Sequence, residues 1–188
     1  MEAFFVSAAV VAIAEIGDKT QLLALMLAAR YRKPTPIILG ILLATLANHA
    51  LAAWLGETVA GWVGAGTMRW ILGISFIVMA GWCLIPDKAD NGPQTTRRAS
   101  AFLATLVAFF IVEIGDKTQI ATVALAARFQ SLLAVTLGTT FGMLLANAPV
   151  VLFGEVVAKR LLLGIVRVAA ALLFLTLGVA ALFMPSSR

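Results

Sequence analysis

The chain has one cysteine, one histidine and few charged side chains, and each shortage excludes a class of protein. Cys83 alone cannot form a disulfide within one chain, which excludes a disulfide-stapled fold. His49 alone cannot build a histidine-rich site for a soft metal. Only 12% of the residues are charged, whereas 62% are hydrophobic and the mean hydropathy is +1.02. Soluble domains do not have this composition, which is typical of a polytopic membrane protein.

Long apolar segments occupy almost all of the 188 residues. They cover residues 4–28, 36–56, 68–86, 101–127, 132–154 and 161–184. Each is long enough to provide the roughly 20 residues that cross the hydrocarbon core of a bilayer. Their continuous apolar character favours helices over the alternating strands of a barrel. The sequence therefore predicts an all-α membrane protein with six transmembrane helices, with the lipid bilayer as its partner and no soluble catalytic domain.

The basic residues lie at the ends of these segments, so the net charge of +5 does not indicate a nucleic-acid partner. One side of the predicted membrane carries Arg30, Arg32, Lys33, Lys88, Arg97, Arg98, Lys159, Arg160 and Arg167, and the other carries Arg69, Arg128 and Arg188. By the positive-inside rule the richer side is cytoplasmic, and both termini are then predicted outside the cytoplasm. Met1-Glu2 has no basic character and no small-residue cleavage site follows, so we expect the first segment to be retained.

Two short stretches interrupt the apolar pattern in the same way. Glu15–Gln21 and Glu113–Gln119 both read E-I-G-D-K-T-Q, and each lies inside a predicted transmembrane segment. A carboxylate at the centre of a bilayer costs about 2.5–3.5 kcal/mol on insertion scales. Charges repeated at this depth therefore indicate a path for a charged substrate.

The internal similarity extends beyond the motif at a constant offset of 98 residues. Further identical pairs are Leu27–Arg30 with Leu125–Arg128, Leu39-Gly40 with Leu137-Gly138, Gly56-Glu57 with Gly154-Glu155, Val59-Ala60 with Val157-Ala158, and Arg69 with Arg167. The chain thus divides into a first three-helix repeat (1–86), a polar cytoplasmic linker (87–100) and a second three-helix repeat (101–188). Because each repeat crosses the membrane an odd number of times, the second is predicted to be inverted relative to the first, and their motifs meet near the midplane.

The four acidic residues of the two motifs are the predicted metal ligands: Glu15, Asp18, Glu113 and Asp116. On a helix, the acids of one motif are three residues apart and share a face. Their oxygens match the roughly six to eight oxygen ligands that Ca²⁺ takes. Carboxylates also suit Mn²⁺ and Mg²⁺, whereas Cu⁺ and Zn²⁺ sites rely more on cysteine and histidine. The pattern therefore predicts a site for a hard divalent cation.

The charge balance of the motifs suggests how such a cation could be coupled to protons. The four carboxylates carry −4 when ionised, and Lys19 with Lys117 return +2, which leaves −2 for one divalent cation. This balance holds if the lysines face the site, which the sequence leaves open. Without a cation, mutual repulsion in a low-dielectric site favours protonated carboxyl groups. Metal and protons would then compete for the same oxygens, which is the minimal requirement of a cation/proton antiporter.

Other polar residues in the apolar segments are candidates for lining the pathway or supporting the ligands. They are Lys19, Thr20, Gln21, Asn48, His49, Lys117, Thr118, Gln119 and Asn147. His49 and Asn147 occupy equivalent positions of the two repeats, and an alternative role for Asn48, His49 and Asn147 is hydrogen bonding between helices. A Glu15–Lys19 pair could likewise serve only to join helices. Gly17 permits either close helix approach or local unwinding.

The doubled E-x-G-D-[KR]-[ST] motif, in two three-helix halves, resembles the Gdt-type cation exchanger family. That family includes Golgi Ca²⁺/Mn²⁺ transporters and bacterial manganese exporters, and the resemblance covers essentially the whole chain. It implies that the four motif carboxylates bind the transported ion and are exposed alternately to each side. It also implies export of Mn²⁺ or Ca²⁺ from the cytosol in exchange for protons, with no prosthetic group.

Two further features bear on the cellular setting. The chain has neither the presequence nor the long central loop expected of organellar relatives, so we expect a bacterial inner-membrane protein with Mn²⁺ as the main substrate. A homo-oligomer is left open. A passive divalent-cation channel is an alternative, since channels can also contain inverted repeats. An intramembrane aspartate-dependent hydrolase is disfavoured by the lysine beside each aspartate and by the lack of another catalytic cluster.

Overall fold

The computed structural model describes residues 1–85, 100–154 and 163–183. The described helices are α1 (Glu2–Glu15), α2 (Lys19–Tyr31), α3 (Pro34–Trp62), α4 (Ala65–Cys83), α5 (Ala101–Glu113), α6 (Lys117–Phe129), α7 (Leu132–Phe153) and α9 (Leu163–Phe183). No strand occurs among these residues, so the predicted all-α class is confirmed for them. Apart from Ser100, the predicted linker 87–100 lies outside the described residues.

Four of the helices are long and apolar enough to cross a membrane. They are Pro34–Trp62, Gly66–Cys83 within α4, Leu132–Phe153 and Gly164–Phe183 within α9. They correspond to the predicted segments 36–56, 68–86, 132–154 and 161–184. α3 extends beyond its predicted segment at both ends, beginning at Pro34 and ending at Trp62.

The predicted segments 4–28 and 101–127 are not single helices, and in this respect the prediction was wrong. Each is divided at its motif, the first into α1 and α2 and the second into α5 and α6. Gly17 and Gly115 stand in the two breaks with φ of 82° and 76°, in the left-handed region that glycine adopts without strain. A residue with positive φ cannot continue a right-handed helix. Hydropathy averaged over a long window does not detect this change, because the stretches before and after each seven-residue motif are apolar.

Polar and apolar residues are distributed in the reverse of a soluble protein. Large apolar side chains such as Trp62, Phe153 and Phe183 are exposed on the surface. Glu15 and Glu113, in contrast, are buried with 0% and 1% exposure. A chain surrounded by hydrocarbon is expected to have this distribution, because its ionisable groups must face the interior of the helix bundle.

The first helix of each repeat packs on the third helical segment of the other repeat. A Cβ atom on Gly138 of α7 would lie 2.4 Å from the carbonyl oxygen of Phe4 in α1. At the equivalent place, a Cβ atom on Gly40 of α3 would lie 2.9 Å from the carbonyl oxygen of Phe102 in α5. Both helix pairs therefore touch backbone to backbone, and the motif at the end of each first helix is positioned by the other half of the chain.

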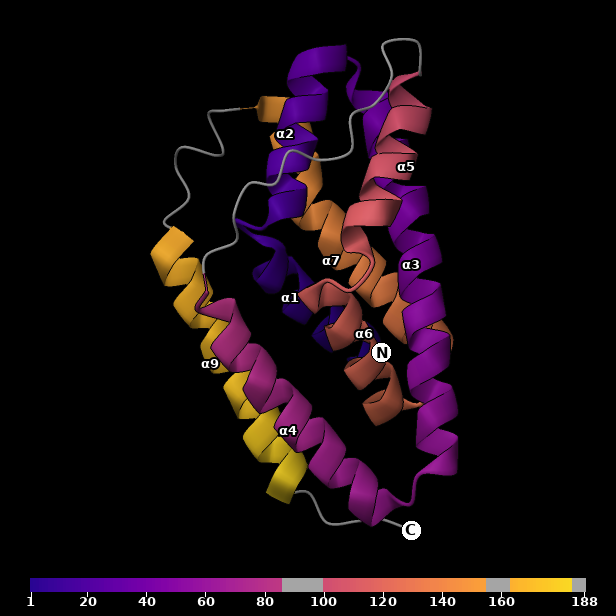
Figure 1. Cartoon of the computed structure of the whole chain (residues 1–188), viewed down its shortest axis with the longest axis vertical. Helices are drawn as coiled ribbons and strands as arrows, with labels where there is room; N and C mark the ends of the chain where they lie inside the picture. The colour runs from indigo at the N-terminus through magenta and orange to yellow at the C-terminus, as the bar shows by residue number, and fades with distance from the viewer. Residues whose placement is uncertain (86–99, 155–162, 184–188) are drawn as a thin grey trace.

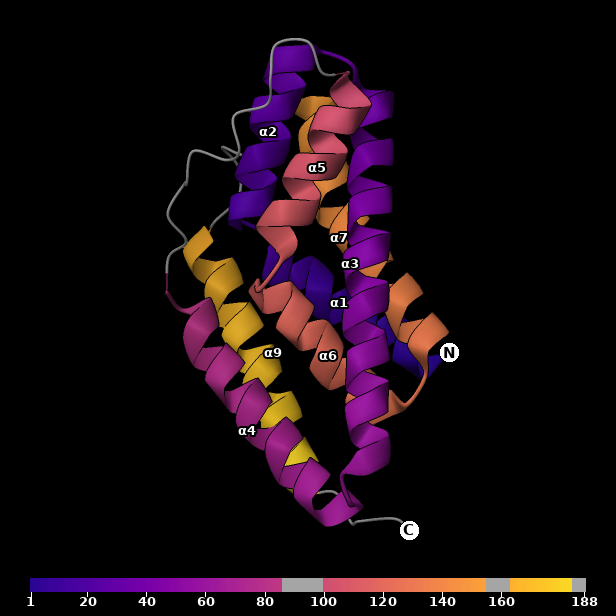
Figure 2. The ribbon, with the colours of Figure 1, turned by 45° about the vertical axis from the view of Figure 1, so that its right-hand side comes forward.

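The motif breaks lie near the middle of the molecule. Figure 1 shows α2 and α5 in one half of the long axis and α1 and α6 in the other, and Figure 2 shows the same division after rotation. α4 and α9 form a separate pair, in which the rings of Phe76 and Phe174 stack with centroids 6.2 Å apart. These two phenylalanines are equivalent positions of the repeats, since they are separated by the same offset of 98 residues.

We expect Gly138→Val to destabilise the protein because the added side chain would force α1 away from α7. Overpacking a tight contact costs about 1–3 kcal/mol, which should lower the Tm of the purified protein in detergent by roughly 5 °C. Gly81→Val is the matched control, since a Cβ atom there meets nothing within 4 Å. Equal melting temperatures for the two variants would contradict the backbone contact between α1 and α7.

Candidate metal centre

Each motif forms a sharp break between two helices, and its glutamine braces that break. The backbone N–H of Gly17 donates to Oε1 of Gln21 at 2.9 Å. In the second copy, Gly115 N–H donates to Oε1 of Gln119 at 2.7 Å. The glutamine side chain thus satisfies a backbone donor that the break removes from the helical pattern. Both glutamines were predicted to line the pathway or support the ligands, and they do contact the motif backbone.

The break also places helix ends beside the acidic residues. Glu15 is the last residue of α1, and Asp18 immediately precedes α2. Glu113 and Asp116 hold the same positions relative to α5 and α6. The start of a helix presents unpaired N–H groups and partial positive charge, which stabilises a carboxylate there. The end of a helix presents carbonyl oxygens, which can contribute to cation binding in discontinuous transmembrane helices.

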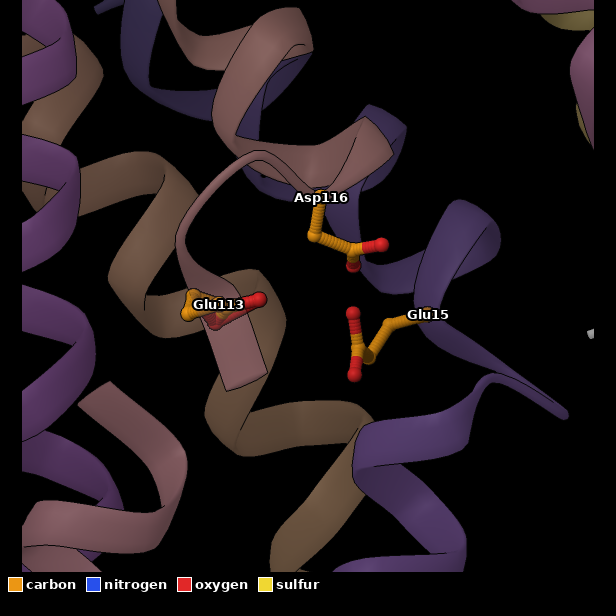
Figure 3. Close-up of side chains that lie close together, drawn as sticks. All are labelled: Glu15, Glu113 and Asp116. Carbon is orange, nitrogen blue, oxygen red and sulfur yellow. The ribbon is translucent and has the colours of Figure 1, made fainter. Parts of the chain in front are cut away.

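Three of the four predicted ligands meet in one buried cluster. One carboxylate oxygen from each of Glu15, Glu113 and Asp116 lies within 4.8 Å of the other two, and all three residues are buried. Figure 3 shows their carboxyl groups pointing toward a common space, with Glu15 coming from α1 and the other two from the second break. Oxygens at this spacing can share one cation, because Ca²⁺–oxygen distances are about 2.3–2.6 Å and oxygens on opposite sides of an ion are twice that far apart.

The fourth predicted ligand takes a different position. Asp18 does not belong to the three-carboxylate cluster, and it forms an ion pair with Lys117 of the second motif. Asp18 is itself buried, with 1% exposure. The prediction of four converging carboxylates therefore corresponds to a cluster of three in this conformation, with the fourth neutralised by a lysine.

Both motif lysines lie at the site, which the sequence left open. Lys19 Nζ lies 3.2 Å from Oδ1 of Asp116, and Lys117 pairs with Asp18. Each lysine thus pairs with the aspartate of the other motif. An ion pair within one motif, between Glu15 and Lys19, was an alternative considered from the sequence. The ion pairs of the structure connect the two halves of the chain. With all six groups charged, the site retains the −2 expected from the sequence.

Threonine and asparagine side chains hold the carboxylates. Thr118 donates to Oε1 of Glu113 at 3.1 Å and to Oδ2 of Asp116 at 3.4 Å. Thr20 donates to Oδ2 of Asp18 at 3.4 Å. Asn147 of α7 donates to Oε1 of Glu15 at 3.3 Å. These three predicted residues therefore contact the acids directly, and Asn147 brings a helix of the second repeat to the first motif.

The remaining predicted residues have different surroundings. Asn48 donates to the carbonyl oxygen of Phe110 at 3.0 Å, so it joins α3 to α5, which is the alternative role considered for it. His49 is 0% exposed, and neither ring nitrogen has a hydrogen-bond partner among the described residues. His49 is not a member of the three-carboxylate cluster in this conformation.

A set of buried hydroxyl groups in α3 and α7 was not predicted from the sequence. Thr136, Thr139 and Thr140 of α7 are all buried, and Thr45 of α3 is buried as well. Their spacing in α7 follows the three-and-four pattern of one helix face, which also includes Asn147. This periodicity within an apolar segment was the signal that could have identified them.

Comparisons with known proteins place the chain in a family. The family model described as "Divalent cation/proton antiporter GDT1" matches residues 3–91 and 101–187. The chain belongs to the GDT1 divalent cation/proton antiporter family. GDT1 proteins are transporters, so the chain is a membrane transporter and not an enzyme, and the hydrolase alternative is discarded.

Several GDT1 relatives match over nearly the whole chain. A candidate manganese exporter of Vibrio cholerae serotype O1 is 54% identical, over 97% of this chain and 92% of the relative. GDT1-like protein 4 of Oryza sativa subsp. indica is 29% identical, over 98% of this chain and 74% of the relative. GDT1-like protein 3 of Arabidopsis thaliana is 27% identical, over 98% of this chain and 71% of the relative. No solved structure gives a significant match to the chain.

Proposed function

We propose that this protein exports Mn²⁺ from the cytosol in exchange for protons, and that Glu15, Glu113 and Asp116 bind the ion. The observation that carries the proposal is the buried cluster of three carboxylates formed from both copies of the motif. Asp18 is the proposed fourth ligand in a further conformation, in which its ion pair with Lys117 is open. The same oxygen ligands accept Ca²⁺, which is the second candidate substrate.

The choice of Mn²⁺ is supported by the relatives and by the ligand chemistry together. The described site offers carboxylate oxygens from three residues, with the hydroxyl group of Thr118 beside two of them, and such oxygen ligands suit a hard divalent cation. Oxygen ligands alone do not separate Mn²⁺ from Ca²⁺. The bacterial relative at 54% identity is named for manganese export, and this favours Mn²⁺ as the cargo of the present chain.

Proton coupling follows from the cost of leaving the site empty. Three carboxylates within 4.8 Å of one another repel strongly when they are buried and ionised. Binding of a divalent cation removes that repulsion, and so does binding of protons. A site that must hold one or the other exchanges metal for protons as it moves between the two sides of the membrane.

Two halves related by inversion suit alternating access around a midplane site, and several observations support this arrangement. The family model matches twice, once in each proposed repeat. α1–α2 and α5–α6 run in opposite directions along the long axis of the molecule (Figure 1). When each broken pair is counted as one crossing, the two repeats 1–86 and 101–188 each cross three times. The distribution of basic residues supports an orientation in a bacterial inner membrane with both termini outside the cytoplasm.

Reconstituted vesicles distinguish an antiporter from the channel alternative. Proteoliposomes carrying a pH-sensitive dye inside should alkalinise internally when Mn²⁺ is added outside, because each entering cation releases protons from the lumen. The membrane potential is clamped with K⁺ and valinomycin to prevent indirect proton movement. Mn²⁺ entry without any change of internal pH would contradict antiport and favour a channel. The same assay with Ca²⁺ ranks the two candidate cargoes.

A further inference from the structure

The two ion pairs at the site cross between the repeats. Lys19 of the first motif pairs with Asp116 of the second, and Lys117 of the second pairs with Asp18 of the first. Each lysine is the first residue of its helix, and each aspartate immediately precedes the opposite helix. The pairs therefore tie the start of α2 to the start of α6.

We propose that Lys19 and Lys117 act as tethered counter-cations that hold the two aspartates when no metal is bound, and that an arriving divalent cation must displace Lys19 from Asp116. This inference rests on the proposed function, since it requires Asp116 to be a ligand. Buried charges are stable only when they are paired, and the lysines provide that pairing in the absence of metal. A divalent cation that takes Asp116 then releases Lys19 and unties one connection between α2 and α6.

Lys19 is the lysine that can leave. Its side chain is 29% exposed, whereas that of Lys117 is 6% exposed. Because part of the Lys19 side chain is already exposed, its ammonium group can leave Asp116 without the rearrangement that a fully buried lysine would need.

The other ion pair is protected against an arriving cation. Asp18 and Lys117 line a small pocket together with Gly17, Cys83 and Arg167. Two basic side chains, Lys117 and Arg167, therefore face this pocket, and their charge disfavours the approach of a divalent cation. A cation reaches the three carboxylates with less opposition from the side of Lys19.

Displacement of Lys19 links metal binding to the relative movement of the two halves of the chain. A ligand shifts a conformational equilibrium only if it interacts differently with the two states. While Lys19 holds Asp116, two ion pairs join the starts of α2 and α6, and after displacement the pair of Lys117 with Asp18 remains. The metal-bound protein thus has one fewer restraint on the relative movement of the two halves.

Chemical labelling of lysines tests displacement in the wild-type protein. Purified protein in detergent is acetylated with an N-hydroxysuccinimide ester, with and without Mn²⁺, and each lysine is quantified by mass spectrometry. We expect Mn²⁺ to raise labelling of Lys19 several-fold and to leave Lys33 unchanged, since Lys33 is exposed and precedes α3. Unchanged or reduced labelling of Lys19 while Mn²⁺ binds would overturn the inference and leave the proposed function intact.

Substitutions of Lys19 separate displacement from a general charge effect. Lys19→Gln should bind Mn²⁺ about tenfold more tightly, because a charged hydrogen bond no longer has to be broken. Lys19→Arg should bind more weakly than wild type, because a guanidinium can hold Asp116 with two parallel hydrogen bonds. Lys33→Gln is the charge-matched control. Lys33 is separated from the site by the thirteen residues of α2, about 20 Å of helix. We therefore expect the Mn²⁺ affinity of Lys33→Gln to stay within about twofold of the wild-type value.

The outcomes of the binding experiment are distinct. Tighter binding in Lys19→Gln with weaker binding in Lys19→Arg supports displacement. Equal binding in Lys19→Arg and wild type indicates only an effect of net charge, and weaker binding in both variants indicates a structural role; either result overturns the inference. Absence of Mn²⁺ binding to the wild-type protein overturns the proposed function and this inference together.

Discussion

Glu15→Gln is expected to abolish Mn²⁺ transport, lowering the initial rate in proteoliposomes by about 100-fold or more. The substitution keeps the size of the side chain and removes one of three converging charges. A buried cation that loses a charged ligand is left with uncompensated charge in a low-dielectric site, which costs several kcal/mol, about 3–5 for a broken buried ion pair. Because 1.4 kcal/mol is a factor of ten in an equilibrium constant, a cost of about 3–5 kcal/mol corresponds to a loss of about 100-fold or more. Asp116→Asn should have a similar effect.

The matched control for this prediction is Glu57→Gln, which makes the same chemical change in α3 at a partly exposed residue outside the cluster. We expect it to transport Mn²⁺ at the wild-type rate. Membrane insertion of all variants is measured by the yield of protein extracted from membranes, which should be unchanged. A strain lacking its own exporter and complemented with Glu15→Gln should stay sensitive to Mn²⁺. Wild-type tolerance with Glu15→Gln and with Asp116→Asn would refute the site assignment.

A series of substitutions at Gly115 is expected to have the second largest effect. The backbone there has φ of 76°, and a Cβ atom would meet nothing within 4 Å, so any cost is conformational and not steric against neighbours. Holding a non-glycine residue at positive φ costs about 1–3 kcal/mol, more for β-branched residues and less for asparagine. Transport should therefore fall in the order Gly, Asn, Ala, Val, with Gly115→Val at least tenfold below wild type.

The physical reason is that Gly115 sets the distance between Glu113 and Asp116. If the break straightens, the two carboxylates leave the positions from which they meet Glu15. Gly81→Val is the control, because Gly81 lies inside a regular helix with open space around it. The readouts are Mn²⁺ uptake and Tm of the same preparations. Equal transport by Gly115→Val and Gly81→Val would show that the break is not needed for function.

Much of the architecture could be predicted because hydropathy and repetition are local properties of the sequence. The apolar segments gave the all-α membrane class, and four of them match single helices in the structure. The doubled motif led to the family that the comparisons then showed. These predictions needed no knowledge of packing, since an apolar run of about 20 residues has few options other than a transmembrane helix.

The broken helices were not predicted, although the residues responsible were in view. Gly17 is compatible with both close packing and local unwinding, and a glycine does not by itself select between them. Local unwinding is favoured by Gln21, whose side-chain oxygen accepts a hydrogen bond from the Gly17 N–H, and by the contacts of α1 with α7. Interactions of this kind join residues in three dimensions and have no signature in hydropathy.

The sequence by itself determined that acidic groups interrupt two apolar segments, in two copies and with a lysine beside each aspartate, because side-chain chemistry and its position along the chain can be read directly. Only the tertiary structure decided which of these groups meet. It gathers Glu15, Glu113 and Asp116 and assigns each lysine to the aspartate of the other motif. That choice depends on how one half of the chain packs on the other, since a residue's partners across a helix bundle are set by the backbone contacts of the helices that carry them.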